Sequence, residues 1–399
     1  MSEAVRTRPR GLPCRSWVEV DLSNLEFNLV SLRNFVGVPV MAVVKADAYG
    51  HGASRVGVAA AKAGCPMLAV VSMEEAVALQ EALTDAGLDC QLLVLGTCDA
   101  YEYGLARELG IHVSVHGPES VESIAASAKR SRRDGVAGQP LMVHLKLDTG
   151  MHRLGAQVSQ AESLVRSLLE TESVELAGVW THLAVADEPD DPFTLSQLAC
   201  FEEAVSSLQT AAGGWPRQKR PLLHAANSAA AIAFPSARYD IVRAGIAIYG
   251  VKPSANFTLP SEIELRPVLS WKSRVVLTKP VEPGSRPSYG RTRAVESSQL
   301  AVVPVGYADG YLRSLSNVGE VLIRGRRCRI AGVVTMDHLI VECAPDVRPG
   351  DEVVLIGRQE SEEITSEELA CKAGTIAYEV LCRIGPRVAR TYLPGSNRD

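Results

Sequence analysis

The sequence contains no apolar run long enough to form a transmembrane helix, which excludes a protein that spans the membrane through such helices. It also lacks a basic excess, because its formal net charge is -5, whereas nucleic-acid-binding domains usually carry surplus lysine and arginine. The first residues, MSEAVRTRPRGLP, include no apolar segment of the kind found in secretory signals. We therefore expect no nucleic-acid or membrane partner. We also expect a disordered N-terminal tail, with a transit peptide as the alternative because arginines alternate there.

None of the nine cysteines forms a C-x-x-C pair, and their odd number argues against a disulfide framework. A reducing compartment fits this usage, so we expect a cytoplasmic protein. The sequence also lacks a G-x-S-x-G elbow and the glycine-rich phosphate-binding loops. His112 and His116 have no evident third ligand, so we expect no metal site.

Short apolar runs alternate with amphipathic helical stretches from about residue 39 to 250. Eight runs are strand candidates: 39–45, 67–71, 92–96, 112–115, 141–147, 176–182, 222–225 and 240–245. They are continuous runs of valine, leucine and isoleucine, which is typical of parallel strands that are buried on both faces. Eight such strands with helical crossovers predict a (β/α)8 barrel, and an open doubly wound sheet is the alternative.

Helical periodicity fades after about residue 262, and short strand-like runs separated by Pro-Gly and Gly-Asp steps predict a small all-β domain. We expect three segments: 1–22, a tail and a strand associated with the β domain; 23–261, the barrel; and 262–399, the C-terminal β-strand domain. The arginine-rich stretch RGRRCR (324–329) lies within a strand-like run and is interpreted as a solvated strand face rather than an anion site.

The first βα junction, VVKADAYGHG (43–52), carries the most suggestive chemistry. Lys45 closes an apolar strand, and the carboxyl end of a barrel strand is where catalytic groups lie. A buried lysine at such a place can form a Schiff base with pyridoxal 5'-phosphate (PLP), because burial disfavours its charged form. Taken alone, the position also suits a lysine that extends its amine into solvent.

VVKADAYGHG resembles the PLP-lysine signature of the alanine racemase family, and further motifs follow in that family's order. They are LDTGMHRLG (147–155), GVWTHLAVAD (178–187), HAANSAA (224–230), RAGIAIYG (243–250), SYGRTRA (288–294), VPVGYADGY (303–311), GVVTMDH (332–338) and AYEV (377–380). The matches span nearly the whole chain. The resemblance implies PLP as the cofactor, a PLP-binding barrel and the interconversion of L- and D-alanine. In a bacterium it would also imply a supply of D-alanine for peptidoglycan.

The resemblance implies a two-base mechanism. Lys45 would hold PLP covalently and exchange a proton on one face of the substrate Cα, and Tyr289 would act on the other face. Two opposed groups are needed because removal and return of a proton on one face restores the same enantiomer. A phenol needs help to act as a base near neutral pH, and the family would supply it by placing His182 against Tyr289 with Arg243 beyond. From local sequence alone, Tyr289 also reads as a packed turn tyrosine.

Arg243 would lie against the pyridine nitrogen of PLP. Arginine donates hydrogen bonds but cannot accept them, so the nitrogen would stay unprotonated, which disfavours transamination. From local sequence alone, Arg243 also reads as a solvent-facing residue at the end of the last barrel strand.

The remaining implied contacts fall into two groups. The other cofactor contacts are Tyr49, Asn227, Ser228 (a capping serine), Gly245, Ile246 and Tyr378. The substrate contacts are Arg153 for the carboxylate, the Met336 backbone, Tyr307, and Lys146, which some members carry as a carbamate. Because Tyr289, Tyr307 and Met336 come from the partner subunit in this family, the resemblance implies a homodimer with shared active sites. From local sequence alone, Ser228 also reads as a plain helix N-cap.

Three positions depart from the commonest family pattern: His152, Thr335 and His338. They leave the assigned catalytic residues in place but put fine substrate preference in doubt. A serine or alanine/serine racemase of the same family is therefore the alternative enzyme. The alternative outside enzymes is a non-catalytic PLP-binding barrel protein, against which the C-terminal motifs count.

Overall fold

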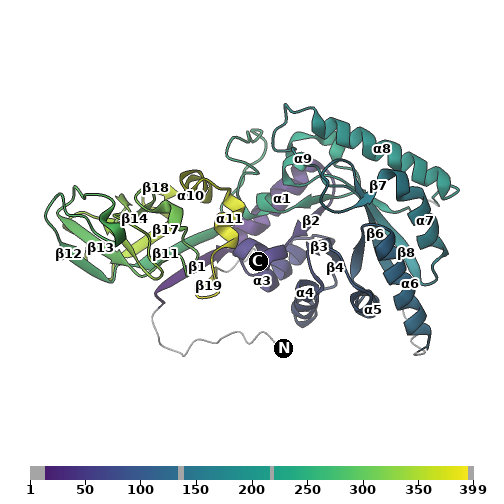
Figure 1. Ribbon diagram of the computed structural model, residues 1–399, viewed down its shortest axis with the longest axis horizontal. Coiled ribbons are helices and arrows are strands. Elements are labelled where there is room, and N and C mark those ends of the chain that lie inside the picture. Colours follow the sequence, from purple (N-terminus) through teal and green to yellow (C-terminus); the bar gives the residue numbers. More distant parts are fainter. Residues whose placement is uncertain (1–13, 134–138, 216–219, 394–399) are drawn as a thin grey trace, which may run out of the picture. The chain divides into compact units, whose positions relative to one another are not determined.

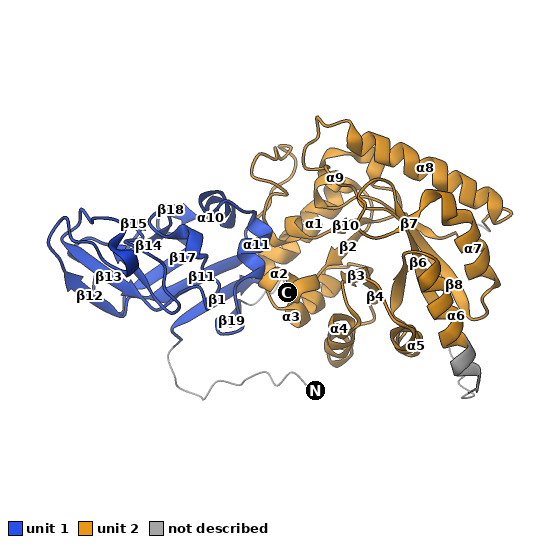
Figure 2. Cartoon of the chain, in the orientation of Figure 1, with its two compact units in different colours: residues 1–21, 267–394 blue, residues 22–266, 395–399 orange. Residues whose placement is uncertain are grey.

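The computed structural model describes residues 14–133, 139–215 and 220–393. The chain forms two compact units, coloured separately in Figure 2. The barrel unit is Leu22–Arg266, and the described part of the β unit comprises residues 14–21 and 267–393. Of the described helices, none has the length and apolarity that a membrane-spanning helix needs.

The barrel unit is a nearly closed parallel barrel, which confirms the predicted fold class (Figure 1). Its strands follow the order β10-β2-β3-β4-β5-β6-β8-β9. Their bounds are β2 (Val40–Val43), β3 (Met67–Val70), β4 (Gln91–Val94), β5 (His112–Val115), β6 (Leu141–Asp148), β8 (Val174–Trp180), β9 (Leu222–His224) and β10 (Val242–Ala244). The first and last strands of this order do not pair as strands, but the Arg243 N–H donates to the Ala226 carbonyl oxygen at 3.0 Å and links the two edges.

Helices separate the barrel strands along the chain. They are α1 (Leu22–Val36), α2 (Lys45–Gly50), α3 (Ala53–Lys62), α4 (Met73–Asp85), α5 (Ala100–Leu109), α6 (Pro118–Arg133), α7 (Ala161–Glu170), α8 (Phe193–Ala211), α9 (Ser228–Ala233) and the 3-10 turns η1 (Val158–Gln160), η2 (Pro235–Ala237) and η3 (Ile246–Tyr249). The short strand β7 (Ala156–Gln157) pairs with β6. Because parallel strands all end at one rim, the residues that follow them are gathered at a single barrel mouth.

The β unit is mostly strands. It comprises β1 (Ser16–Asp21), β11 (Leu269–Arg274), β12 (Leu277–Pro280), β13 (Gln299–Val303), β14 (Glu320–Ile323), β15 (Arg326–Arg329), β16 (Leu339–Glu342), β17 (Glu352–Gln359), β18 (Glu362–Ile364), β19 (Ala389–Leu393) and the 3-10 turns η4 (Tyr289–Arg291) and η5 (Arg313–Leu315). β1 pairs with β11 and β19, so residues from the beginning of the chain complete this sheet.

The expectation of a purely β domain is wrong in one respect, because the β unit also contains α10 (Ser366–Ala373) and α11 (Ala377–Cys382). Thr365 caps α10 through its side chain, which accepts a hydrogen bond from the Glu368 N–H at 3.0 Å. A threonine three residues before a glutamate is a sequence signal for a helix start, so this helix could have been predicted.

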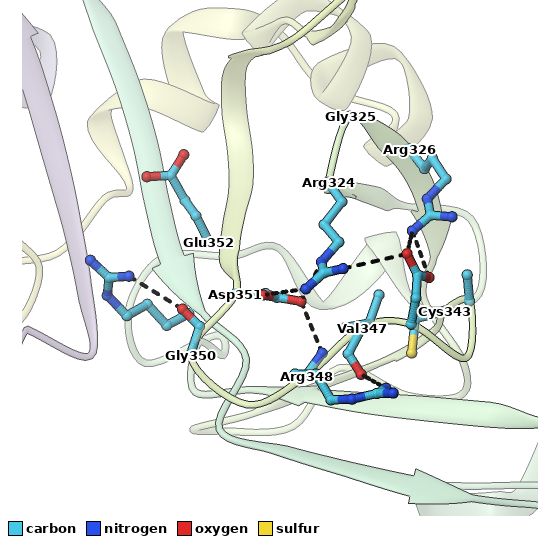
Figure 3. A network of polar contacts seen from close by, with 12 residues as sticks. Arg324, Gly325, Arg326, Cys343, Val347, Arg348, Gly350, Asp351 and Glu352 are labelled. Carbon is cyan, nitrogen blue, oxygen red and sulfur yellow. Dashed lines mark hydrogen bonds and ion pairs between the residues drawn. The ribbon is translucent and has the colours of Figure 1, made fainter.

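The arginine-rich stretch lies at the surface, as expected, and each of its first arginines faces carboxylates. Arg324 binds Asp351 at 2.8 Å and Asp346 at 3.5 Å, and Arg326 binds Asp346 at 2.6 Å (Figure 3). Arg327 contacts three glutamates of the same unit. These positive charges are therefore balanced locally by the protein itself.

Candidate active site

Lys45 stands at an unusual backbone turn directly after β2. The next four residues, Ala46 to Tyr49, all have left-handed conformations with φ between 52 and 55°. None is glycine, and for L-residues this conformation costs about 1–2 kcal/mol each. Strained backbone persists only where surrounding structure holds it, and it is concentrated at functional sites.

Glu75 on α4 holds the start of this turn. Its Oε1 accepts a hydrogen bond from the Ala46 N–H at 2.6 Å, and its Oε2 accepts one from the Val71 N–H at 2.8 Å. The carboxylate thus ties the junction after β2 to the junction after β3. Asp47 adds a second tie, because its Oδ1 accepts from the Ala53 N–H at 2.8 Å. The backbone that carries Lys45 is therefore fixed from both ends of the turn.

Tyr49 is the last residue of the left-handed run, and it packs against Tyr249 with ring centroids 4.9 Å apart. The Tyr249 hydroxyl donates to the Val43 carbonyl oxygen at 2.9 Å. A Cβ on Gly245 would collide with the Tyr49 hydroxyl, so the glycine allows that hydroxyl to reach the segment before η3. The structure thus brings Tyr49 and Gly245 together.

The loops after β9 and β10 also meet. The Ser228 Oγ accepts hydrogen bonds from the Gly245 N–H at 2.9 Å and from the Ala247 N–H at 3.4 Å. The expectation that Ser228 caps a helix is wrong, because the N-cap of α9 is Asn227, whose side chain accepts from Ala230. η3 begins at Ile246, so its first N–H groups have no partner inside that short helix. Asn227, Ser228, Gly245 and Ile246 therefore form one polar patch at the mouth.

Arg243 on β10 is 3% exposed and is not a solvent-facing residue. Its Nη1 donates to His224 Nδ1 (2.8 Å) and the His224 carbonyl (3.0 Å), and its Nη2 donates to the Thr181 (2.7 Å) and Ala225 (2.9 Å) carbonyls. With His182 Nδ1, which lies 3.4 Å from Nη2, these acceptors occupy the hydrogens of both terminal nitrogens, and within the described residues the Nε–H has no acceptor. The guanidinium is fixed in place with one donor left for a ligand.

Lys146 on β6 is 3% exposed and lies over the Trp180 ring, 4.7 Å from its centroid. Burial, with the positive charges of Arg153 and Arg243, lowers the pKa of Lys146 to about 8. The nearby loop is organised by Asp148, whose carboxylate accepts N–H bonds from Gly150 and His152 at 3.0 Å each and whose charge opposes the shift. Arg153 itself is exposed on this loop.

His182 follows β8 and lies beside Arg243, with its Nδ1 3.4 Å from the Arg243 Nη2. Burial and the positive charges of Arg243 and Lys146 lower the pKa of His182 well below its ordinary value. The ring is therefore neutral at neutral pH and is available as a hydrogen-bond partner.

Three predicted site residues are exposed side chains of the β unit: Tyr289, Tyr307 and Met336. Their exposed fractions are 73%, 43% and 53%, which is high for large side chains. Their loops are joined, since the Ser288 hydroxyl donates to the Val333 carbonyl at 2.7 Å and the Ala308 N–H donates to the Met336 carbonyl at 3.1 Å. Tyr378, on α11, is partly buried.

Sequence reasoning missed several residues that build this site. Glu75 reads as an ordinary helix-start glutamate, because Ser72 three residues earlier caps α4. His144 and His224 read as core residues of strands, although both lie in the hydrogen-bonded surroundings of Arg243. Among the described residues, no cluster of three or more histidine, cysteine, aspartate or glutamate side chains is arranged to hold a metal ion.

Comparison with known proteins gives consistent matches over the whole length. The family model for the alanine racemase N-terminal domain matches residues 20–253, and the model for the C-terminal domain matches residues 268–392. The alanine racemase of Symbiobacterium thermophilum is 45% identical over 94% of this chain and 97% of its own length. That of Halothermothrix orenii is 41% identical over 94% and 96%.

Solved structures agree with these sequence matches. The alanine racemase of the D-cycloserine producer Streptomyces lavendulae superposes with a TM-score of 0.87 at 36% identity, covering 96% of this chain and 98% of its own. The alanine racemase of Bacillus anthracis, solved with bound L-Ala-P, gives a TM-score of 0.86 at 34% identity and covers 97% of both chains.

Proposed function

Because this chain belongs to the alanine racemase family, we propose that it is a PLP-dependent alanine racemase that interconverts L- and D-alanine. The observation that carries the proposal is the buried Arg243, which is fixed by neutral acceptors and keeps one donor, its Nε–H, without an acceptor among the described residues. The relative from Bacillus anthracis that was solved with bound L-Ala-P supports alanine as the substrate.

The donor groups at the barrel mouth fit PLP. Lys45 would offer an amine for its aldehyde, and the Ser228 and Tyr49 hydroxyls with the Ile246 N–H would donate to its phosphate. The Gly245 N–H, which donates to Ser228 Oγ in this structure, would turn to the phosphate in its place. The cluster of positive charges at Lys45, Lys146, Arg153 and Arg243 also favours an anionic cofactor and an anionic substrate. Bound PLP supplies an electron sink that makes the proton on the substrate Cα acidic.

In this proposal two residues move that proton. Lys45 Nζ removes or returns it on one face of the substrate Cα, and the Tyr289 hydroxyl does so on the other face. The exposure of Tyr289, Tyr307 and Met336 supports a homodimer in which these side chains complete the site of a second copy of the chain. Because His182 Nδ1 accepts from Arg243, its Nε2–H would then donate a hydrogen bond to the hydroxyl oxygen of Tyr289 contributed by that second copy.

Arg243 would donate its Nε–H to the pyridine nitrogen and keep it unprotonated, because a guanidinium cannot accept a proton there. This limits how far negative charge spreads into the ring and favours return of the proton over transamination. Arg153 would bind the substrate carboxylate together with the Met336 backbone. Tyr307 and Tyr378 would narrow the entrance and so favour a small side chain.

We also propose that Lys146 carries a carbamate. Its pKa of about 8 leaves a substantial neutral fraction near neutral pH, and only the neutral amine attacks CO2, forming an N–C bond and releasing a proton. The resulting anion would face the Arg153 guanidinium and orient it. A cytoplasmic location is supported by the nine cysteines, all of which are free thiols.

The proposal is tested with the full-length enzyme in deuterated water. Lys45→Ala is expected to lose racemisation and the visible absorbance of lysine-bound PLP. Tyr289→Phe is expected to block exchange of the α-proton of one alanine enantiomer while exchange from the other continues. Tyr101→Phe, at a tyrosine that is 74% exposed on α5, is the matched control and should behave as wild type. Equal, mild losses with both enantiomers would remove Tyr289 from its assigned role.

A further inference from the structure

Three buried histidines form a continuous hydrogen-bonded chain across the barrel core. His112 on β5, His144 on β6 and His224 on β9 are 5%, 0% and 0% exposed. His112 Nδ1 lies 2.9 Å from His144 Nε2, and His144 Nδ1 lies 3.0 Å from His224 Nε2. The chain ends at Arg243, whose Nη1 is 2.8 Å from His224 Nδ1. None of these three imidazoles has a part in the proton transfers proposed above.

A glycine on the intervening strand makes room for this series of histidine rings. β8 lies between β6 and β9 in the sheet, so the His144 ring must cross it to reach His224. His144 pairs in register with Gly178 of β8, and a Cβ on Gly178 would collide with the imidazole ring. The residue that the ring crosses is thus one without a side chain.

Arg243 determines the proton positions along the whole chain. A guanidinium only donates, so His224 Nδ1 must accept and the proton of His224 must be on Nε2. That Nε2–H donates to His144 Nδ1, which places the proton of His144 on Nε2 as well. The His144 Nε2–H in turn donates to His112 Nδ1, so the proton of His112 is also on Nε2. Every ring is therefore neutral and carries its proton on Nε2.

We infer that His112, His144 and His224 are positioning residues for Arg243: they present a neutral acceptor that orients a charged guanidinium without neutralising it. The inference rests on the proposed function in one respect, namely that Arg243 faces the pyridine nitrogen of PLP. A carboxylate at the place of His224 Nδ1 would hold the guanidinium equally well but would cancel its charge. The imidazole chain keeps both the orientation and the charge.

The titration behaviour of these groups agrees with the geometry. Burial lowers the pKa of His112 to about 4, and it lowers the pKa of His144 and of His224 well below the ordinary histidine value. Burial also lowers the pKa of Arg243 to about 9, which still leaves it charged at neutral pH. Neutral rings beside a retained cation are the state that the hydrogen bonds require.

The direct test is imidazole ¹⁵N NMR of the full-length protein at neutral pH, with and without PLP. We expect the signals of all three buried rings to report the Nε2–H tautomer. A proton on Nδ1, or an imidazolium, at any of the three would overturn the inference. This result does not depend on catalysis, so a protein with the expected tautomers but no racemisation of alanine would refute the proposed function alone.

The functional test uses substitutions of His144. His144→Phe leaves the His224 Nε2–H without an acceptor, and we expect kcat to fall about 10-fold or more with little change in KM for alanine. His144→Asn offers a carbonyl oxygen near the place of Nδ1, and we expect it to recover most of kcat and to restore the His224 tautomer signal. If racemisation and PLP affinity in a folded His144→Phe equal those of the wild type, the positioning role is refuted.

Discussion

The buried cations at the mouth of the barrel and the surface arginines of the β unit differ in the partners of their positive charge. In the β unit, Arg324 and Arg326 lie at the surface and each binds at least one carboxylate (Figure 3). In the barrel, Arg243 and Lys146 are both 3% exposed, and the hydrogen-bond acceptors of Arg243 are carbonyl oxygens and imidazole nitrogens. Within the part of the chain that the structure describes, neither of these two buried cations forms an ion pair with a carboxylate.

This difference separates charges that serve the fold from charges that serve a ligand. Burying a cation without a carboxylate partner costs free energy. Selection for folding stability alone would therefore not retain such a residue. Perturbed, unneutralised groups in a concave site are typical of binding and catalysis. Arg243 and Lys146 are therefore suited to an anionic ligand, whereas Arg324 and Arg326 are paired with carboxylates of their own unit.

Among the substitutions that test this difference, Arg243→Glu should have the largest effect, because it reverses the sign of the buried charge. A carboxylate accepts hydrogen bonds but cannot donate one, so it could not serve an unprotonated pyridine nitrogen at the place proposed for it. We expect kcat for L-alanine to fall by about 10³-fold, the scale of losing a preorganised electrostatic group. Steady-state racemisation and the absorbance spectrum of the bound cofactor measure the effect.

Arg243→Lys is the matched control because it retains the charge. Its single ammonium group cannot serve all five acceptors around the guanidinium, so we expect a smaller but clear loss. If the Glu and Lys variants are equally active, the charge of Arg243 has no role in the reaction.

Glu75→Gln tests the strained turn rather than the charge cluster. An amide keeps one carbonyl oxygen, so either the Ala46 or the Val71 N–H loses its acceptor. We expect kcat to fall by about 10-fold through misplacement of Lys45, together with faster amide hydrogen exchange over residues 44–52. Glu74→Gln, at an exposed neighbour, is the control. Unchanged amide hydrogen exchange in the Glu75 variant would show that the turn is stable without the Glu75 carboxylate.

Much of the fold could be predicted because it depends on local patterns. The continuous apolar runs gave all eight barrel strands, for example 92–96 against β4 (Gln91–Val94) and 240–245 against β10 (Val242–Ala244). The site residues on the barrel could be named only because complete motifs resemble a known family. Local sequence alone also suited a solvent-facing Arg243 and a capping Ser228, and the structure excludes both.

What could not be predicted depends on contacts between distant strands or on backbone conformation. His144 and His224 are separated by 80 residues, and they become neighbours only because their strands flank β8, which has Gly178 at the position that the His144 ring crosses. The left-handed turn from Ala46 to Tyr49 contains no glycine, so no propensity rule indicates it. Its stabilising partner, Glu75, carries a sequence signal that points only to a helix start.

Lys146 provides a test of whether one of the buried barrel amines is converted to an anionic carbamate. Because its pKa is about 8, its neutral fraction falls as the pH drops, and carbamate formation falls with it. In enzyme freed of CO2, we expect added bicarbonate to lower KM for alanine several-fold at about pH 8 and much less at about pH 6. Lys146→Gln should not respond at either pH. A bicarbonate effect that grows toward acidic pH would contradict the carbamate.

The smallest effect is expected in the β unit, where Arg324→Gln removes the contacts with Asp346 and Asp351. Exposed ion pairs contribute little to stability because water and salt screen them, so kcat and KM should stay within about twofold of wild type. The midpoint of urea unfolding should move little and should move less at high salt. Racemisation assays and urea titrations at two salt concentrations measure both. A large loss of activity would mean that this network, too, serves the reaction, and the contrast between the two units would fail.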